Sequence, residues 1–229
     1  MLKFAGHLFL AAMALCTSAR ATTTDNFFAD STLSSKWVVA SGNAASTIKV
    51  IPTLGLLMTA SASNGGSDLY SGSNYNAPMV FQNIQSSANW TSTVSLAFND
   101  CVCYYTGAGI ILATQPGKFT EMKQFLRVIE RGQLSSATSL SGDTLRADLY
   151  GANATISLIN DVVLLRVQKA GQNYTASYSL DGLTFTTLSK FTDSREFTYI
   201  GLETIHQPYD GNTAINEQAL FSDFEFFPQ

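Results

Sequence analysis

Three segments of the chain alternate polar and apolar residues, and their polar positions hold the side chains best suited to bind a ligand. These segments are residues 122–131, 163–169 and 198–204. Alternate residues of a β-strand point to opposite faces, so each segment is predicted to have one apolar and one polar side. If the three strands are neighbours, we expect one polar face made by Lys123, Phe125, Arg127, Arg166, Gln168, Tyr199 and Glu203.

The residue types on this face are those that recognise sugars. Guanidinium and amide groups hydrogen-bond hydroxyls or carboxylates, and aromatic rings stack on sugar rings. The three basic residues would favour an acidic sugar. An ordinary solvated sheet face, with an ion pair between Glu203 and an arginine, is the alternative. The same alternation predicts that Glu130 shares the apolar side with Leu126 and Val128.

A second candidate ligand-binding site is the glycine- and tyrosine-containing stretch from Asp68 to Asn76. Tyr70 would stack on a sugar ring, and Asp68 and Asn74 would anchor its hydroxyls. Tyr104 and Tyr105 add two more aromatic residues in a predicted loop. The alternative is a set of turn residues whose tyrosines pack on the end of the domain.

Catalytic residues are not expected from the spacing of the acidic groups. Glycosidases use two carboxyl groups about 5 to 10 Å apart, and no predicted strand carries such a set. Asp223 and Glu225 are predicted to point outward from an edge strand. A polysaccharide lyase would need a base such as His206 with Arg127 and Gln168, but alternation puts His206 on the apolar side of its strand. Hydrolase and lyase activities stay open as alternatives to sugar binding without catalysis.

The elements that position these residues are short strands separated by turns. Val162–Lys169 and Asn173–Leu180 flank Gly171-Gln172, and Asp181-Gly182 predicts a two-residue hairpin in which φ is positive. No segment has a convincing helical period. We therefore predict an all-β fold, a two-sheet antiparallel β-sandwich, forming a single domain over residues 22–229.

Several short motifs follow one another in an order that resembles a known family. They are Asp25-Asn26-Phe27-Phe28 with Trp37, Asn76-Ala77-Pro78, Ala108-Gly109-Ile110-Ile111, the hairpin segment 164–185, Tyr199-Ile200-Gly201-Leu202 and Phe221-Ser222-Asp223-Phe224-Glu225-Phe226. The series is similar to the C-terminal concanavalin A-like domain of β-xylosidases and to the bacterial "regulation of enolase protein" domain. Residues 132–160 depart from the pattern.

The resemblance implies a concanavalin A-like jelly roll and a carbohydrate-related, lectin-like role. In β-xylosidases this domain accompanies a separate catalytic propeller, which 229 residues are too few to contain as well. The resemblance therefore carries no catalytic residues to this chain.

The N-terminal segment predicts export. Lys3 precedes an apolar run from Leu8 to Leu15, and Ala19-Arg20-Ala21 supplies small residues for cleavage after residue 21. A lipid anchor at Cys16 is disfavoured by the bulky Leu15 before it. We expect a secreted, extracellular protein that is not inserted in a membrane, because the apolar run is far shorter than the roughly 20 residues of a membrane span.

Composition limits the partners further. Of the 13 basic residues, Lys3 and Arg20 lie in the predicted signal, while all 17 acidic residues lie after it. This excess of acidic groups argues against nucleic acid as a partner. Cys101-x-Cys103 lacks a second ligand pair and no Asp-x-Asp-x-Asp run occurs, so no metal or other cofactor is expected. The redox state of the two cysteines is left open, and so is glycosylation of Asn89, Asn153 and Asn173. We expect a monomer that binds a carbohydrate or polysaccharide.

Overall fold

The computed structural model consists almost entirely of β-strands. It describes residues 23–25, 27, 31–70, 74–84, 89–99, 106–114, 125–133, 143–147, 152–156, 162–206 and 216–229. One 3-10 turn, η1 (Ser63–Gly65), interrupts the strands. Within the described residues, no helix is long and apolar enough to cross a membrane.

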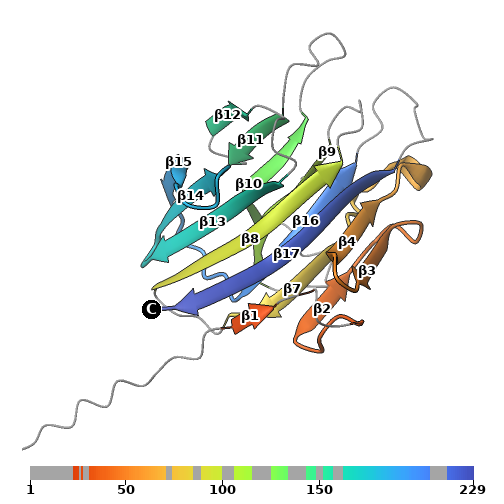
Figure 1. Ribbon diagram of the computed structural model, residues 1–229, viewed down its shortest axis with the longest axis horizontal. Coiled ribbons are helices and arrows are strands. Elements are labelled where there is room, and N and C mark those ends of the chain that lie inside the picture. The colour runs from red at the N-terminus through yellow and green to blue at the C-terminus, as the bar shows by residue number, and fades with distance from the viewer. Residues whose placement is uncertain are drawn as a thin grey trace, which may run out of the picture.

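The first sheet, called sheet A here, is antiparallel and faces the viewer in Figure 1. Its main path has the strand order β15-β14-β13-β8-β17-β4-β3, and β1 pairs with β17 beside that path. The strands are β1 (Thr23–Asp25), β3 (Thr47–Ile51), β4 (Gly55–Ala60), β8 (Asn89–Asn99), β13 (Val162–Ala170), β14 (Asn173–Ser179), β15 (Thr186–Thr192) and β17 (Glu217–Pro228).

The second sheet, called sheet B, lies behind the first (Figure 1) and has the order β12-β11-β10-β9-β16-β7-β2. Its strands are β2 (Trp37–Ala40), β7 (Met79–Asn83), β9 (Thr106–Ala113), β10 (Phe125–Gln133), β11 (Asp143–Ala147), β12 (Ala152–Ile156) and β16 (Tyr199–His206). A two-stranded hairpin of β5 (Leu69–Tyr70) and β6 (Asn74–Tyr75) completes the described strands. The predicted all-β, two-sheet antiparallel sandwich is confirmed.

The main hydrophobic core lies between the two sheets. It combines Val94 and Val167 from sheet A with Ile110, Leu126 and Leu202 from sheet B, among others. The period-two pattern of each strand supplies these residues, since apolar side chains recur at every second position. The predicted inward direction of Leu126, Val167 and Leu202 is therefore confirmed, because each of the three is fully buried.

Two turn predictions have different outcomes. β13 and β14 are joined by the two residues Gly171 and Gln172, with Gly171 at a φ of 60°. The predicted two-residue hairpin at Asp181-Gly182 is wrong, because β14 ends at Ser179 and β15 begins only at Thr186. Asp181 instead closes a longer turn: its Oδ1 accepts hydrogen bonds from the backbone N–H groups of Leu183 (2.8 Å) and Thr184 (2.7 Å). These bonds hold the pKa of the Asp181 carboxyl well below its ordinary value.

The last strand also differs from its prediction. Phe224 and Phe226 are buried and Asp223 is exposed, as expected. However, β17 is not an edge strand, since it pairs with β8 on one side and with β4 and β1 on the other. Its register shifts between Ser222 and Glu225, and Asp223 within this bulge has a φ of 50°.

Candidate functional site

The polar face predicted from three strands is divided between the two sheets. β13, which carries Arg166 and Gln168, pairs with β8 and β14 in sheet A. β10 and β16 flank β9 in sheet B. The prediction of one shared face is therefore wrong, because alternation assigns a residue to a side of its strand and not to a sheet.

Arg166 and Gln168 lie on the outer face of sheet A. The guanidinium carbon of Arg166 lies 3.3 Å from the centroid of the Phe185 ring, and its Nε donates a hydrogen bond to Thr93 Oγ1 at 3.2 Å. Partial burial lowers the pKa of Arg166 from its ordinary value, and the charge of Glu225 opposes this shift. Cation–π stacking and the hydrogen bond hold Arg166 against its own sheet.

Of the remaining predicted residues, Tyr199 and Glu203 lie on the outer side of β16 in sheet B. Tyr199 is half-buried, and it packs against a second apolar cluster that is separate from the main core. This cluster contains Met79, Phe81, Ile111 and Ile205, at positions that alternate with those of the main core. Lys123 lies outside the described residues, and only the backbone is described for Phe125, Arg127, Tyr70 and Asn74.

Backbone pairing places several of these positions in common rows, where a row is a set of residues that lie directly opposite one another on β10, β9 and β16. Phe125 and Tyr199 both pair with Ala113, from the two sides of β9. Arg127 and Gly201 both pair with Ile111, two residues before Ala113 on β9. The register thus brings the backbones of Phe125 and Arg127 into the rows of Tyr199 and Gly201.

Glu203 is the most unusual residue of this face. It is fully buried although it points away from the main core, as its alternation with Leu202 and Thr204 requires. Its cross-strand neighbours are Gly109 on β9 and Met79 on β7. Burying a carboxylate is costly unless it is paired, so a carboxylate buried outside the main core is a candidate for function.

The backbone pairing of β10 is irregular just before Glu130, whose side chain lies outside the described ones. The register of β10 on β9 shifts between Arg127 and Ile129, so that Ile129 pairs with the core residue Ile110 and Glu130 pairs with Gly109. A β-bulge of this kind interrupts the period of two. The backbones of Glu130 and Glu203 therefore lie on either side of Gly109.

The β5–β6 hairpin brings the second predicted site next to the first. Tyr70 pairs with Asn74 in this hairpin. Leu69 and the nearby Ala77 belong to the same apolar cluster as Met79 and Phe81, so this part of the chain lies over the outer face of sheet B. Asp68, predicted to anchor ligand hydroxyls, is 4% exposed, and its Oδ1 accepts a hydrogen bond from the Leu69 N–H at 2.7 Å.

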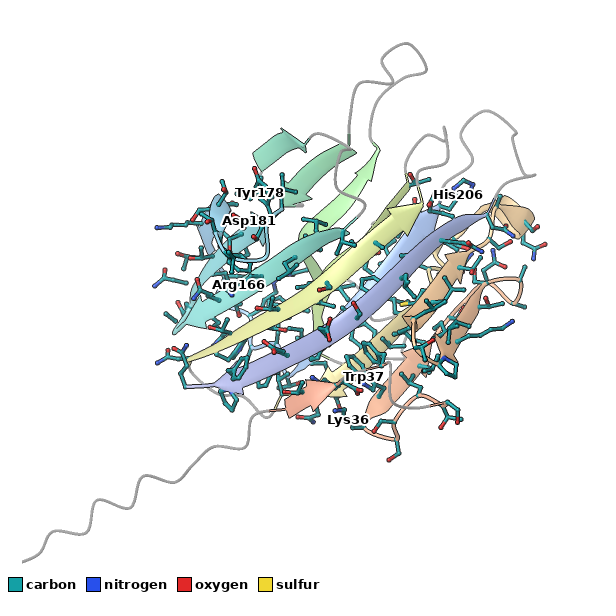
Figure 2. The ribbon with its side chains drawn as sticks, in the orientation of Figure 1. Lys36, Trp37, Arg166, Tyr178, Asp181 and His206 are labelled. Atoms are coloured by element: carbon teal, nitrogen blue, oxygen red, sulfur yellow. The ribbon has the colours of Figure 1, made fainter. Side chains whose placement is uncertain are left out.

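The residues proposed for a lyase are not brought together. His206 is 1% exposed, and it lies on the side of β16 that faces the main core. Arg166, two residues before Gln168 on β13, lies far from His206 across the molecule (Figure 2). His206, the base of the lyase hypothesis, and Gln168, its amide, therefore lie in different sheets of the sandwich.

Comparison with known proteins identifies the fold. No family model matches the chain, and no curated protein sequence matches it. Among solved structures it is similar to the functionally unknown protein from Saccharomyces cerevisiae, with 13% identity and a TM-score of 0.55 over 85% of this chain and 97% of that one.

Two further structures have names that refer to carbohydrates. Lectin I-B4 from Griffonia simplicifolia is similar over 90% of this chain and 98% of its own, with 11% identity and a TM-score of 0.58. The xylan β-1,4-xylosidase from Bacillus halodurans has 14% identity and a TM-score of 0.61 over 89% of this chain. The match spans only 38% of the xylosidase. These likenesses show that the chain has a concanavalin A-like sandwich fold, as the sequence motifs predicted.

Proposed function

We propose that this protein is a lectin-like module that binds a carbohydrate or polysaccharide without catalysis, on the outer face of sheet B beside the β5–β6 hairpin. The observation that carries the proposal is the position of Glu203 on the outer side of β16, in one row with Gly109 and Met79 and on the same side as the half-buried ring of Tyr199. A carboxylate accepts strong hydrogen bonds from sugar hydroxyls, and an aromatic ring stacks on a sugar ring.

The rest of the face complements Glu203. Tyr199 lies four residues away on the same side of β16, about 13 Å along the strand, and supplies a ring for stacking. Phe125 and Arg127 lie in the neighbouring rows, and Tyr70 and Asn74 lie on the adjoining hairpin. The fold is shared with a lectin and with part of a xylosidase, which supports a carbohydrate ligand.

A glycoside hydrolase is the second candidate function, and one specific observation favours it. Glu130 and Glu203 lie on the two strands that flank β9, both opposite Gly109. Their Cα atoms are thus two strand spacings apart, roughly 9.5 Å. A hydrolase of the inverting type would require their carboxyl groups, and not their Cα atoms, to lie about 6.5 to 9.5 Å apart.

Binding to immobilised polysaccharides tests the proposal. The full chain is passed over neutral and acidic polysaccharides and compared with Glu203→Gln, which removes the charge at nearly constant shape. Glu196→Gln is the matched control, because Glu196 is exposed and precedes the same strand. We expect retention of the unaltered protein and of the control. Glu203→Gln is expected to bind about tenfold or more weakly, since a hydrogen bond to a charged group contributes about 1.5 to 3 kcal/mol.

The same samples separate the alternatives. Release of reducing ends that is lost in Glu203→Gln would establish the hydrolase, and absorbance from unsaturated uronates would establish a lyase. Equal retention of Glu203→Gln and unaltered protein, with circular dichroism showing both folded, would remove Glu203 from the site. Failure of every polysaccharide to retain the protein would contradict carbohydrate binding.

We also propose that the protein is exported, acts outside the cell as a monomer and needs no cofactor. Export rests on the N-terminal pattern of Lys3, the apolar run and Ala19-Arg20-Ala21. The proposal of no cofactor rests on the sequence, in which Cys101-x-Cys103 lacks a second ligand pair and no Asp-x-Asp-x-Asp run occurs. Cys101 and Cys103 lie outside the described residues.

A further inference from the structure

A row of three buried polar residues crosses the end of sheet B. His206 pairs with Thr106 on one side and with Ser67 on the other. The bridge to Ser67 uses both backbone groups, with N–H···O distances of 2.8 and 2.6 Å. Thr106 and Ser67 are fully buried and His206 is 1% exposed. Figure 2 shows His206 at the end of the sandwich, next to the turn that contains η1.

The side chains of Thr106, His206 and Ser67 differ in their hydrogen-bond partners. Ser67 Oγ accepts a hydrogen bond from Asn43 Nδ2 at 3.2 Å, donates one to the Ser61 carbonyl at 2.9 Å, and contacts Ser46 Oγ at 2.7 Å. Neither ring nitrogen of His206 nor Thr106 Oγ1 has a hydrogen-bond partner in the described part of the chain. Thr204 Oγ1, two residues before His206 on the same side of β16, has none there either.

Among the described residues, few charged groups lie near the imidazole of His206. The described strands β9, β7 and β4 contain no Asp, Glu, Lys or Arg. β17, which packs against β16 across the core, contributes Glu217. Glu217 is fully buried, and its Oε1 accepts a hydrogen bond from the Gln218 N–H at 3.1 Å. Asp68 follows Ser67 along the chain, and Glu203 lies on the opposite side of β16.

We propose that the row Thr106–His206–Ser67 is a proton-operated latch. It holds the end of the sandwich closed while His206 is neutral and opens the Ser67–His206 pairing when the imidazole takes up a proton. An imidazolium has two N–H donors and a charge, and burial of such a group without acceptors is strongly unfavourable. Opening at η1 and the end of β16 gives the charged ring access to water.

The direction of the pH effect follows from the burial of the ring. Desolvation lowers the pKa of His206 below its ordinary value in the closed form. The open form has an ordinary histidine, with a pKa of about 6.5. The open form therefore binds the proton more tightly, and the closed form loses stability as the pH falls from about 6.5 toward the lowered pKa. The ratio of open to closed molecules rises by up to about tenfold per pH unit.

Hydrogen exchange between pH 5 and 8 tests the latch in the full chain. We expect the protection factors of the Ser67 and His206 amides, corrected for intrinsic exchange rates, to fall below about pH 6.5. The matched variant is His206→Gln, which keeps a polar side chain but does not titrate, and its protection factors should not depend on pH in this range. Equal pH dependence in the two proteins, or protection that increases in acid, overturns the proposal.

Two further measurements keep the test decisive if His206→Gln folds poorly. An NMR titration of the unaltered protein gives the pKa of His206 directly, with His7→Gln to assign the other histidine. A value at or above about 6.5 overturns the latch. In Glu217→Gln, the pH dependence should persist. Its loss would identify Glu217 as the titrating group and would also overturn the proposal.

Discussion

Gly201 shows how a single missing side chain shapes the outer face of sheet B. A Cβ at this position would lie 2.4 Å from the carbonyl oxygen of Val80 and 2.5 Å from Cδ1 of Phe81. The Phe81 ring occupies the space that a side chain would need, and it belongs to the apolar cluster against which Tyr199 packs. The glycine therefore helps to set the position of the face proposed to bind sugar.

Gly201→Ala is expected to destabilise the protein by roughly 1 to 3 kcal/mol, because the backbone of Val80 cannot move away without disturbing its pairing with β16. Urea unfolding followed by fluorescence measures the free energy of unfolding. Gly42→Ala is the matched control, since Gly42 is exposed and does not have a positive φ. Equal stability of the two variants would show that the close approach to Phe81 relaxes freely.

At the scale of elements, β1 and β2 connect the two sheets at one edge of the sandwich. β1 pairs with β17 of sheet A, and β2 pairs with β7 of sheet B. The indole Nε1 of Trp37 donates a hydrogen bond to Asp25 Oδ2 at 2.5 Å, and Lys36 Nζ lies 3.1 Å from the same oxygen. The Trp37 ring also packs edge-on against Phe224 of sheet A, with ring centroids 5.0 Å apart.

Asp25→Ala is expected to lower the free energy of unfolding by about 1 to 3 kcal/mol, because the buried indole N–H loses its acceptor. Asp25→Asn should lose less, since the amide oxygen still accepts this hydrogen bond. Lys36→Met serves as the control for the ion pair and should change stability by at most about 1 kcal/mol, as expected for a partly exposed pair. Thermal or urea unfolding of the three variants checks the order, and an Asp25→Ala protein as stable as Lys36→Met would contradict it.

At the scale of the whole molecule, the strand order decides which candidate residues share a surface. β13 carries Arg166 into sheet A, while β10 and β16 form part of sheet B. The protein therefore presents two distinct outer faces. One carries serine and threonine beside Arg166, including Thr93 and Ser177, and the other carries the apolar cluster of Met79, Phe81, Ile111 and Ile205.

Export concerns the whole chain and has its own test. Expression in a secreting host is expected to yield a protein that begins at Thr22, because Ala19 and Ala21 supply the small residues that signal peptidases require. Mass spectrometry and N-terminal sequencing measure this directly. Ala19→Phe should reduce cleavage, whereas Thr23→Ser, beyond the cleavage site, should not. A mature chain that begins with a lipid-modified Cys16 would replace this proposal with membrane anchoring.

Local pattern was sufficient to predict the strands and their apolar sides. Leu126, Val167 and Leu202 point into the core, as alternation predicted, because a period of two depends only on the chain next to each residue. The same reasoning placed His206 on the core side, and the structure confirms it. The order of short motifs also predicted the concanavalin A-like fold.

The tertiary structure alone determines which of these strands pair with one another and in which register. The bulge in β10 moves Glu130 into the row of Gly109 and Glu203, and no local signal in the sequence marks it. The assignment of β13 to sheet A depends on its long-range pairing with β8, which separates Arg166 from Glu203. Side-chain direction is a property of a few consecutive residues, whereas strand order and register are set by the packing of the complete sandwich.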